Sequence, residues 1–250
     1  MISKSKIKFI NSLRLKKNRV LHKKFIIEGE KIANELINSS FKICEVFALK
    51  EWIDKYHYSH NSLFEVSRSD LKKISGLKSP NQVLMIAEFK SVINNVDLDT
   101  EFLLVLDNIQ DPGNLGSIIR TCDWFGIRNI VCSKNTVDVF NSKVIQSTMG
   151  SCFRVQVQYR DLVSLLHNIK NKEIPIYVSC IKGENISCEN KYKKSGVIVI
   201  GNESQGVSER LKSFASNRVS IQNIGDSAES LNVSSATAIL LHAFCSDYPL

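Results

Sequence analysis

Three polar segments of this sequence each follow an apolar run and carry side chains that can hold and polarise a ligand. Asn114 and Arg120 lie in the first segment, Glu203 in the second, and Ser230 and Asn232 in the third. A glutamate at the end of an apolar stretch is costly without partners, and backbone N–H groups at the start of a helix can bind a polar ligand. Each segment also has a purely structural interpretation, in which Asn114 and Ser230 cap helices and Arg120 is a surface residue.

The residues around these side chains narrow the chemistry. The first segment reads DNIQDPGNLGSIIR over residues 107–120, so a turn separates an apolar run from a helix that carries the arginine. The spacing places Asn114 at the helix N-cap and Arg120 about one and a half turns into the helix. The second segment reads GNESQGVS over residues 201–208 and lacks the Lys and Ser/Thr of a phosphate loop. With no G-x-G-x-x-G in the sequence, a dinucleotide site of the usual kind is not supported either.

Strand and helix patterns alternate from residue 102 to the end of the chain, which predicts a mostly parallel sheet covered on both faces. Strands are predicted at 102–106, 128–132, 155–158, 175–179, 196–200 and 217–221. Helices are predicted at 114–125, 141–149, 160–170, 207–214 and 231–246. Ligands of such sheets bind at the carboxyl ends of the strands, so the polar segments that follow the strands are expected to build a site there.

Residues 1–90 form a separate, compact α/β pattern. Strands are predicted at 25–27, 43–48, 63–66 and 83–87, with helices at 7–13, 30–37 and 51–56. Ser67 and Asp70 form a capping-box pattern that opens one more short helix, which ends at Gly76. Residues 91–101 are polar and aperiodic, so the sequence predicts a domain at 1–90, a linker at 91–101 and a second domain at 102–250.

The net charge of +8 is concentrated at the N-terminus. Residues 1–27 contain nine of the 33 basic residues and no acidic one, whereas the rest of the chain carries 24 basic and 25 acidic residues. A basic patch on a neutral body favours a polyanionic partner such as nucleic acid. A solvated helix face is the simpler alternative. A transit peptide is disfavoured because lysine outnumbers arginine and a strand follows directly.

Cysteine, histidine and apolar runs exclude several classes of protein. The seven cysteines form no C-x-x-C pair and sit mostly in apolar contexts, so reduced thiols are expected and no metal site or disulfide framework. His57 and His60 lie in a Tyr- and Ser-rich stretch that is typical of a solvated loop. No apolar run is long enough to span a membrane, and no signal-peptide core follows the basic run. We therefore expect a cytoplasmic protein.

Together and in this order, the three segments resemble the three motifs of the SpoU-type (TrmH-like) RNA ribose 2′-O-methyltransferases. The motifs are D-N-x-Q-D-P-G-N-x-G-x-x-x-R, G-N-E-x-x-G-V-S and S-L-N-V-S, the last at residues 230–234. Residues 147–154, STMGSCFR, resemble the stretch between motifs one and two. This resemblance covers residues 103–245. Residues 8–87, with KKFIIEG at 23–29, resemble the small RNA substrate-binding domain often fused ahead of it.

The resemblance implies a small N-terminal α/β domain of the ribosomal L30e-like type and a C-terminal α/β domain of the SPOUT type, whose chain forms a trefoil knot. Local sequence patterns do not predict such a knot, since true knots are rare. The implied cofactor is S-adenosylmethionine, held in a bent shape around Gly201, Ile221 and Leu231. The family resemblance also implies a homodimer through the C-terminal domain, in which the motif-one arginine reaches the cofactor site of the partner subunit.

The implied reaction transfers a methyl group from S-adenosylmethionine to a ribose 2′-hydroxyl of structured RNA. The sulfonium methyl is already activated, whereas a protonated hydroxyl is a weak nucleophile. A guanidinium stays protonated and is a poor base, so we assign Arg120 the role of a fixed positive charge beside the developing alkoxide. Asn114 and Glu203 would hold Arg120 and the ribose in place, and Ser230 and Asn232 would line the loop beside them. No metal is required.

Arg14, Lys16, Lys17 and Arg19 are expected to hold the RNA through phosphate contacts, which add affinity but little sequence choice. Ribosomal RNA is favoured over transfer RNA because the fused N-terminal module is common among members that modify ribosomal RNA. Three alternatives stay open. A knotted base methyltransferase would need a carboxylate base, and a non-catalytic RNA binder would be expected to lose Arg120, Glu203 or Asn232, all of which are present. An antibiotic-resistance methyltransferase shares both the fold and the reaction.

Overall fold

The structure is a computed structural model that describes residues 2–89, 97–186, 195–225 and 229–245. The chain forms two compact units, which are described separately. The first unit contains the described residues of 1–91 and also the segment 138–153, and the second contains those of 92–137 and 154–250. Most of the predicted linker, residues 91–96, lies outside the described residues. The domain boundaries at 90 and 102 therefore stay a prediction.

The first unit contains a four-stranded sheet in the order β1-β4-β2-β3. Strand β4 pairs antiparallel with β1 and with β2, and β2 pairs parallel with β3. Ser67 caps α5 by accepting from the Asp70 N–H, as the sequence pattern predicts. The elements before residue 91 are α1 (Lys4–Ser12), α2 (Lys16–His22), β1 (Lys24–Glu28), α3 (Glu30–Ile37), β2 (Ile43–Ala48), α4 (Lys50–Tyr56), β3 (Leu63–Glu65), α5 (Arg68–Ile74) and β4 (Val83–Glu88).

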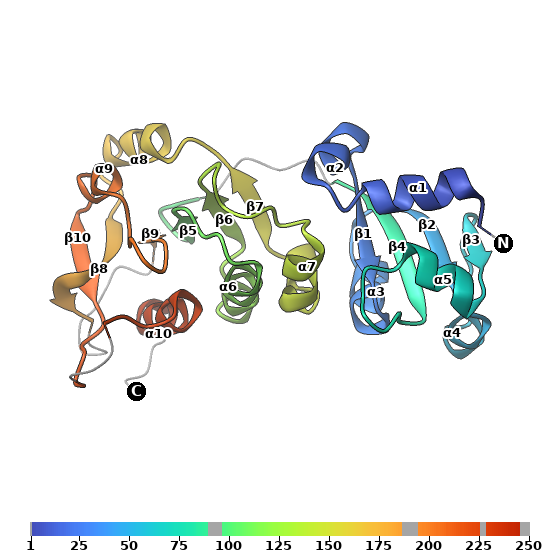
Figure 1. The fold of residues 1–250 in the computed structure, drawn as a ribbon. Helices are drawn as coiled ribbons and strands as arrows, with labels where there is room; N and C mark the ends of the chain where they lie inside the picture. The colour runs from blue at the N-terminus through green and yellow to red at the C-terminus, as the bar shows by residue number, and fades with distance from the viewer. Residues whose placement is uncertain (1, 90–96, 187–194, 226–228, 246–250) are drawn as a thin grey trace. The chain divides into compact units, whose positions relative to one another are not determined.

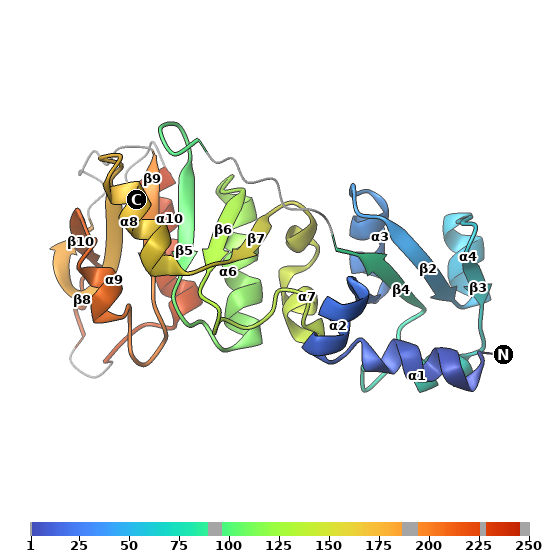
Figure 2. The same cartoon turned by 90° about the horizontal axis from the view of Figure 1, so that it is seen from above.

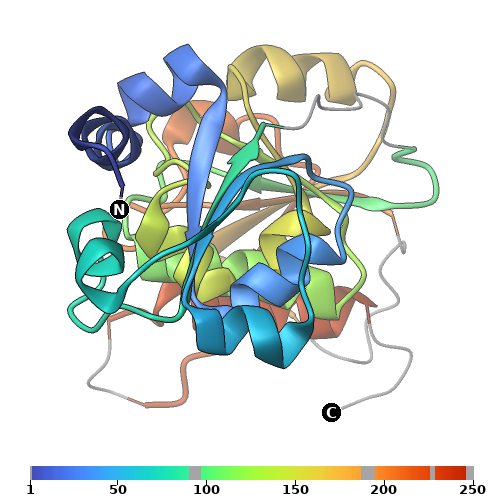
Figure 3. The same ribbon diagram turned by 90° about the vertical axis from the view of Figure 1, so that its right-hand side faces the viewer.

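Helices cover both faces of this sheet because successive strand side chains point to opposite faces. Helices α1 and α5 lie side by side (Figure 3), and their buried residues form one core with one set of strand side chains. Helix α3 contacts β1 and β4 from the other face (Figure 2). Helix α7 (Ser142–Thr148) and the short 3-10 helix Ser151–Phe153 complete the unit, and α7 contacts β1.

The second unit contains a six-stranded sheet in the order β10-β8-β9-β5-β6-β7, and every strand pair in it is parallel. The predicted α/β class with a parallel sheet is confirmed. The elements are β5 (Phe102–Leu106), α6 (Pro112–Trp124), β6 (Asn129–Cys132), β7 (Gln156–Tyr159), α8 (Leu162–Lys170), β8 (Ile176–Asn185), β9 (Gly196–Ile200), α9 (Glu209–Lys212), β10 (Asn217–Ser220) and α10 (Val233–Cys245).

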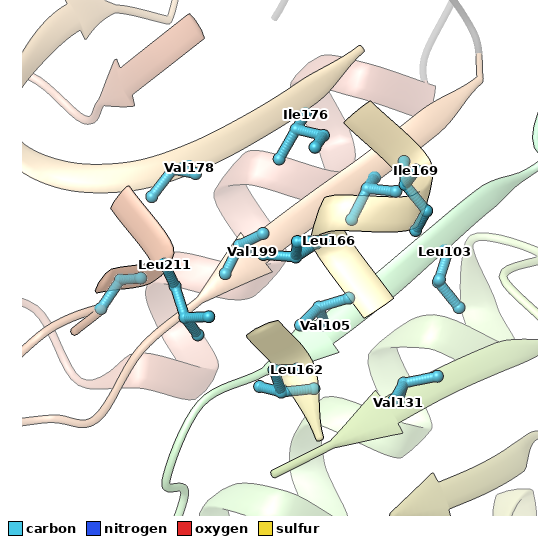
Figure 4. Packing of buried hydrophobic residues seen from close by; sticks show 12 residues of the cluster. Leu103, Val105, Val131, Leu162, Leu166, Ile169, Ile176, Val178, Val199 and Leu211 are labelled. Atoms are coloured by element: carbon cyan, nitrogen blue, oxygen red, sulfur yellow. The ribbon is translucent and has the colours of Figure 1, made fainter. Parts of the chain in front are cut away.

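Helices lie on both faces of the parallel sheet. Helices α8 and α9 cover one face, and α6 and α10, which pack against each other, cover the other (Figure 1). All five residues of β5 and all five of β9 are buried, which explains their continuous apolar sequence. Figure 4 shows the apolar side chains of α8 packed onto these strands. From β5 the chain continues to β6 toward one edge of the sheet, and from β9 it continues to β10 toward the other edge. Ligands of open α/β sheets bind where the direction reverses in this way, which is between β5 and β9 here.

The cysteines of the described residues are free thiols. Burial raises the pKa of the Cys122 and Cys132 thiols, and it raises the pKa of Cys245 to about 11. Such thiols stay protonated at neutral pH and are poor nucleophiles. Cys188 lies outside the described residues. Within the described ranges, no cluster of three His, Cys, Asp or Glu residues could hold a metal ion, and no helix is long and apolar enough to cross a membrane.

Candidate active site

The first two polar segments leave the sheet next to each other. Strands β5 and β9 are neighbours, and Leu106 at the end of β5 is paired with Ile200 at the end of β9. The Asp107 N–H extends this ladder by donating to the Ile200 carbonyl at 2.8 Å. Because the strands are parallel, the loops that carry the two segments start at the same edge of the sheet.

Side chains then fasten the two loops together. The Asp107 carboxylate accepts from the Ser208 N–H at 3.0 Å, and the Asn202 side chain donates to the Asn108 carbonyl at 2.9 Å. Asn108 has a left-handed backbone with φ of 60°, a conformation that Asn tolerates better than most residues. Its N–H donates to the Ser133 hydroxyl at 2.9 Å. The first loop is thus held from both sides.

Gly201 opens the second loop at a point of close backbone contact. A Cβ atom there would lie 2.1 Å from the carbonyl carbon of Gly206 and 2.1 Å from the nitrogen of Val207. Asn202 and Gly206 exchange two backbone hydrogen bonds of 3.1 and 2.9 Å across the loop. Only glycine allows the two backbones to approach in this way. The loop therefore has one closed shape that fixes the position of Glu203.

Asn114 joins all three polar segments. Its Nδ2 donates to Oε1 of Glu203 in the second segment at 2.7 Å. Its Oδ1 accepts from Nδ2 of Asn232 in the third segment at 3.0 Å. The amide can satisfy both contacts in one orientation only, because a carboxylate accepts and an amide nitrogen donates. The structure thus brings together Asn114, Glu203 and Asn232, three of the predicted site residues.

The helix that carries Asn114 begins earlier than predicted. Helix α6 starts at Pro112, and its N-cap is Asp111, whose Oδ1 accepts from the Asn114 N–H at 2.8 Å. The prediction of Asn114 as the N-cap was therefore wrong. The signal was present in the sequence, since Asp is a preferred N-cap and Pro is favoured at the first helical position. Asn114 keeps its side chain free to contact Glu203 because Asp111 caps the helix.

Asn232 in the third segment caps helix α10. Its Oδ1 accepts from the Ser234 N–H at 2.9 Å at the start of α10. Ser230 is exposed and makes no hydrogen bond with the described residues, so the structure does not bring it into the network around Asn114. Its predicted place beside the site stays a prediction. Residues 226–228 of this loop lie outside the described residues.

Two family profiles match almost the whole chain. The profile of the SpoU rRNA Methylase family matches residues 101–242. The chain belongs to the SpoU rRNA methylase family. A second profile, the MRM3-like substrate binding domain, matches residues 4–85. The resemblance seen in the three motifs and in the N-terminal region is thereby confirmed.

Related proteins align with nearly the whole length of this chain. The 23S rRNA (guanosine(2553)-2′-O)-methyltransferase RlmP of Bacillus subtilis is 29% identical over 95% of this chain and 94% of its own. The structure of a TrmH-family protein from Porphyromonas gingivalis has a TM-score of 0.89 and 32% identity, covering 98% of both chains. The AdoMet-bound rRNA methyltransferase from Sinorhizobium meliloti has a TM-score of 0.82 and 26% identity, covering 98% of this chain and 96% of that one.

Arg120 lies apart from the Asn114 network. It is exposed and makes no hydrogen bond or ion pair with the described residues. Six helical positions separate it from Asn114, which places the two about 120° apart around the helix and about 9 Å apart along it. Ser117 and Trp124, the latter 85% exposed, lie on the same helix stripe as Arg120. The structure therefore does not bring Arg120 to the Asn114 and Glu203 of its own chain.

The predicted cofactor residues lie in or next to the second and third polar segments in sequence. Gly201 precedes the Glu203 loop and is buried, Ile221 follows β10 and is half-buried, and Leu231 is 49% exposed. Leu231 directly precedes Asn232 in the chain, and Asn232 donates to Asn114. Such a combination of backbone, polar and exposed apolar groups fits an adenosine-containing cofactor. Their role in binding stays a prediction.

Both arginines among the four predicted RNA-binding residues form ion pairs within the chain. The Arg19 side chain is 4% exposed and pairs with Asp138, and it also donates to the Leu13 and Arg14 carbonyls. The Arg14 side chain pairs with Glu28 at 3.0 Å. The expectation that Arg19 contacts RNA phosphates was therefore wrong, because its guanidinium is buried and fully used, and Arg14 is largely engaged. Lys16 and Lys17 are exposed on α2.

Several residues that shape the site were missed by sequence reasoning. They are Asp107, Asn108, Asp111, Ser133 and Asn202, whose contacts fix the loops. The strand-end position of Asp107 and the Asp-Pro pair were usable signals. Ser133 gave no such signal, because it accepts from the Asn108 N–H at the end of the neighbouring strand β6.

Proposed function

We propose that this SpoU-family chain transfers the methyl group of S-adenosylmethionine to a ribose 2′-hydroxyl of structured ribosomal RNA. The observation that carries the proposal is the Asn114 side chain, which joins the three polar segments at the switch point of a parallel sheet. The relatives support the substrate class, since RlmP is named as a 23S rRNA (guanosine(2553)-2′-O)-methyltransferase. We propose the cytoplasm as its location, because its relative RlmP is a bacterial rRNA methyltransferase.

The chemical task is to make a sugar hydroxyl reactive and to aim it. When bound, S-adenosylmethionine supplies a methyl group on a positively charged sulfur, which leaves as a neutral thioether. The protein has to orient the hydroxyl in line with that methyl group and to stabilise negative charge as the hydroxyl proton passes to water or to a nearby RNA phosphate. Asn114 and Glu203 offer an oriented amide and a carboxylate that can hold the ribose hydroxyls. Gly201, Ile221 and Leu231 would hold the cofactor beside them.

We propose that Arg120 supplies the positive charge to the site of a second subunit. Its position on α6 points away from its own Asn114, and no described residue neutralises it. The same stripe carries Trp124, and tryptophan is enriched in protein interfaces. A homodimer that packs α6 against a second copy would complete two identical sites, one for each arginine.

We propose that the exposed lysines of the N-terminal unit contact the RNA backbone. Lys4, Lys8, Lys16, Lys17 and Lys23 are all exposed, in contrast to Arg19. They lie on or beside α1 and α2, within the region matched by the substrate-binding profile. Such contacts release counterions, so the affinity for RNA should fall steeply as salt is raised.

Neutralising three of these lysines should flatten the salt dependence. In the triple variant Lys8→Gln, Lys17→Gln and Lys23→Gln, the slope of log K against log salt is expected to become shallower by roughly 0.7–0.9 for each phosphate that the protein no longer neutralises. Fluorescence anisotropy with a labelled rRNA fragment measures the slope. Lys42→Gln is the control, because Lys42 already pairs with Glu88. A triple variant with the wild-type slope would place the RNA-binding surface elsewhere.

The function itself is tested by incubating the protein with S-adenosylmethionine and total bacterial RNA and mapping 2′-O-methyl groups. The expected result is a new 2′-O-methyl site in ribosomal RNA. Methylation confined to transfer RNA would correct the substrate. A base-methylated nucleoside in digested RNA would favour a base methyltransferase. Failure to bind S-adenosylmethionine in calorimetry would favour a non-catalytic RNA binder. Either of the last two results would overturn the proposal.

A further inference from the structure

The segment 138–153 lies within the sequence of the methylase domain but packs as part of the first, N-terminal unit. It lies inside the stretch matched by the SpoU profile, residues 101–242. In the structure it is part of the first unit, together with the region matched by the substrate-binding profile, residues 4–85. The chain therefore passes between the units after residue 137 and after residue 153, in addition to the passage near residue 91.

A buried ion pair holds the start of this segment. Arg19 donates to Oδ2 of Asp138 from Nε at 2.9 Å and from Nη2 at 2.5 Å. Its Nη1 donates to the carbonyls of Leu13 and Arg14 at 3.0 and 2.7 Å. The side chains of Arg19 and Asp138 are only 4% and 13% exposed. Because burial of either charge alone is strongly unfavourable, each depends on the other to stay in place.

Further contacts hold the rest of the segment. The ring centroid of Phe140 lies 4.3 Å from that of Phe25 and 4.6 Å from that of Phe89. The Gln146 side chain donates to the Glu28 carbonyl at 2.6 Å. These contacts are specific in direction and spacing, which distinguishes the segment from a loop that only rests on a surface.

Thr136 and Val137, just before Asp138, are hydrogen-bonded to Ile109 in the loop that follows β5. The Val137 N–H donates to the Ile109 carbonyl at 2.9 Å, and the Ile109 N–H donates to the Thr136 hydroxyl at 3.3 Å. Ile109 lies in the same loop as Asn108, which is held by Asn202. Asp138 is thus the next residue along the chain from a stretch that is hydrogen-bonded to the loop leading to Asn114.

We propose that Arg19 and Asp138 are positioning residues for methyl transfer, which tie the substrate-binding unit to the stretch of chain that is hydrogen-bonded to the loop of Asn108 and Ile109. Neither Arg19 nor Asp138 needs to touch the RNA for this role. This inference rests on the proposed function. In this proposal, the buried Arg19 of the basic N-terminus has a structural role, which is to hold Asp138 in place.

The inference is tested by changing the charge of residue 138 while keeping its shape. Asp138→Asn removes the charge, and kcat/KM for folded rRNA is expected to fall by at least about tenfold, since small misplacements of a substrate cost large factors. Asp138→Glu keeps the charge and should retain activity within a few-fold. The affinity for S-adenosylmethionine should be unchanged in both. Glu30→Gln is the matched control, because Glu30 pairs with Lys55 within residues 1–91 and should leave kcat/KM unchanged.

Hydrogen exchange provides a readout that does not depend on activity. In Asp138→Asn, backbone amides of 19–28 and 138–148 should exchange roughly tenfold faster, while those of β5 and β9 stay protected. Asp138→Asn with both the wild-type exchange pattern and the wild-type kcat/KM would overturn the inference, as would equal losses in Asp138→Asn and Asp138→Glu. A wild-type protein that methylates no RNA would contradict the proposed function alone. The exchange pattern would still test whether Arg19 and Asp138 hold the segment in place.

Discussion

Replacing Arg120 with alanine is expected to lower the rate of methyl transfer to RNA by at least about 100-fold, the usual cost of removing a group that stabilises developing negative charge. The affinity for S-adenosylmethionine should stay within a few-fold of wild type, because Arg120 is assigned to the ribose hydroxyl and the cofactor is assigned to Gly201, Ile221 and Leu231. Incorporation of labelled methyl groups into RNA measures the first quantity and calorimetry the second.

A lysine at this position separates charge from shape. Arg120→Lys keeps a positive charge but loses the planar fork, so an intermediate rate is expected. Ser117→Ala is the control, since Ser117 lies one turn earlier on the same exposed stripe of α6 and is not assigned a role in the reaction. If Arg120→Ala transferred methyl groups within a few-fold of wild type, Arg120 would not be the charge that assists the hydroxyl.

Mixed dimers show which subunit Arg120 serves. Arg120→Ala and Glu203→Ala are each expected to be inactive alone. If Arg120 acts on the partner's site, a random mixture should recover roughly a quarter of wild-type activity, because half the dimers would be mixed and each of those would hold one complete site. If Arg120 acted within its own chain, a mixed dimer would hold no complete site. Recovery of activity after co-refolding therefore decides between the two arrangements.

The fold of the second unit was predictable because its signals are local. The five-residue apolar runs of β5 and β9 are bounded by polar turns, and such runs are typical of strands buried on both faces. Parallel strands place their carboxyl ends at one edge, so a common site for the first two segments followed from the alternation of elements. The knot implied by the family has no such local signal.

The contacts within the site were less accessible. Asn114 and Asn232 are 118 residues apart in sequence, and their hydrogen bond depends on how α6 and α10 pack. Arg19 shows the same difficulty from the opposite side. In a run of lysines it looks like one more exposed cation, and only Asp138, 119 residues away, makes it a buried one. Residue type indicated which groups were polar, but the partner decided which were free to bind.

Replacing Gly201 with alanine is expected to disrupt the site by displacing the backbone of the loop that carries Glu203. The new Cβ would lie 2.1 Å from backbone atoms of both Gly206 and Val207, and backbone atoms cannot move aside as the tip of a side chain can. The exchange of hydrogen bonds between Asn202 and Gly206 would have to open. Glu203 would then leave its 2.7 Å contact with Asn114.

We therefore expect Gly201→Ala to lose methyl transfer, to bind S-adenosylmethionine at least tenfold more weakly, and to be less stable by about 1–3 kcal/mol, as for other overpacked sites. Gly206→Ala is the matched control in the same loop. Its Cβ would meet nothing within 4 Å, so the φ of 68° is the sole source of strain, at a cost of about 1–2 kcal/mol. Urea unfolding and calorimetry compare the two. If Gly206→Ala weakened cofactor binding as much as Gly201→Ala, backbone crowding at Gly201 would not be what shapes the loop.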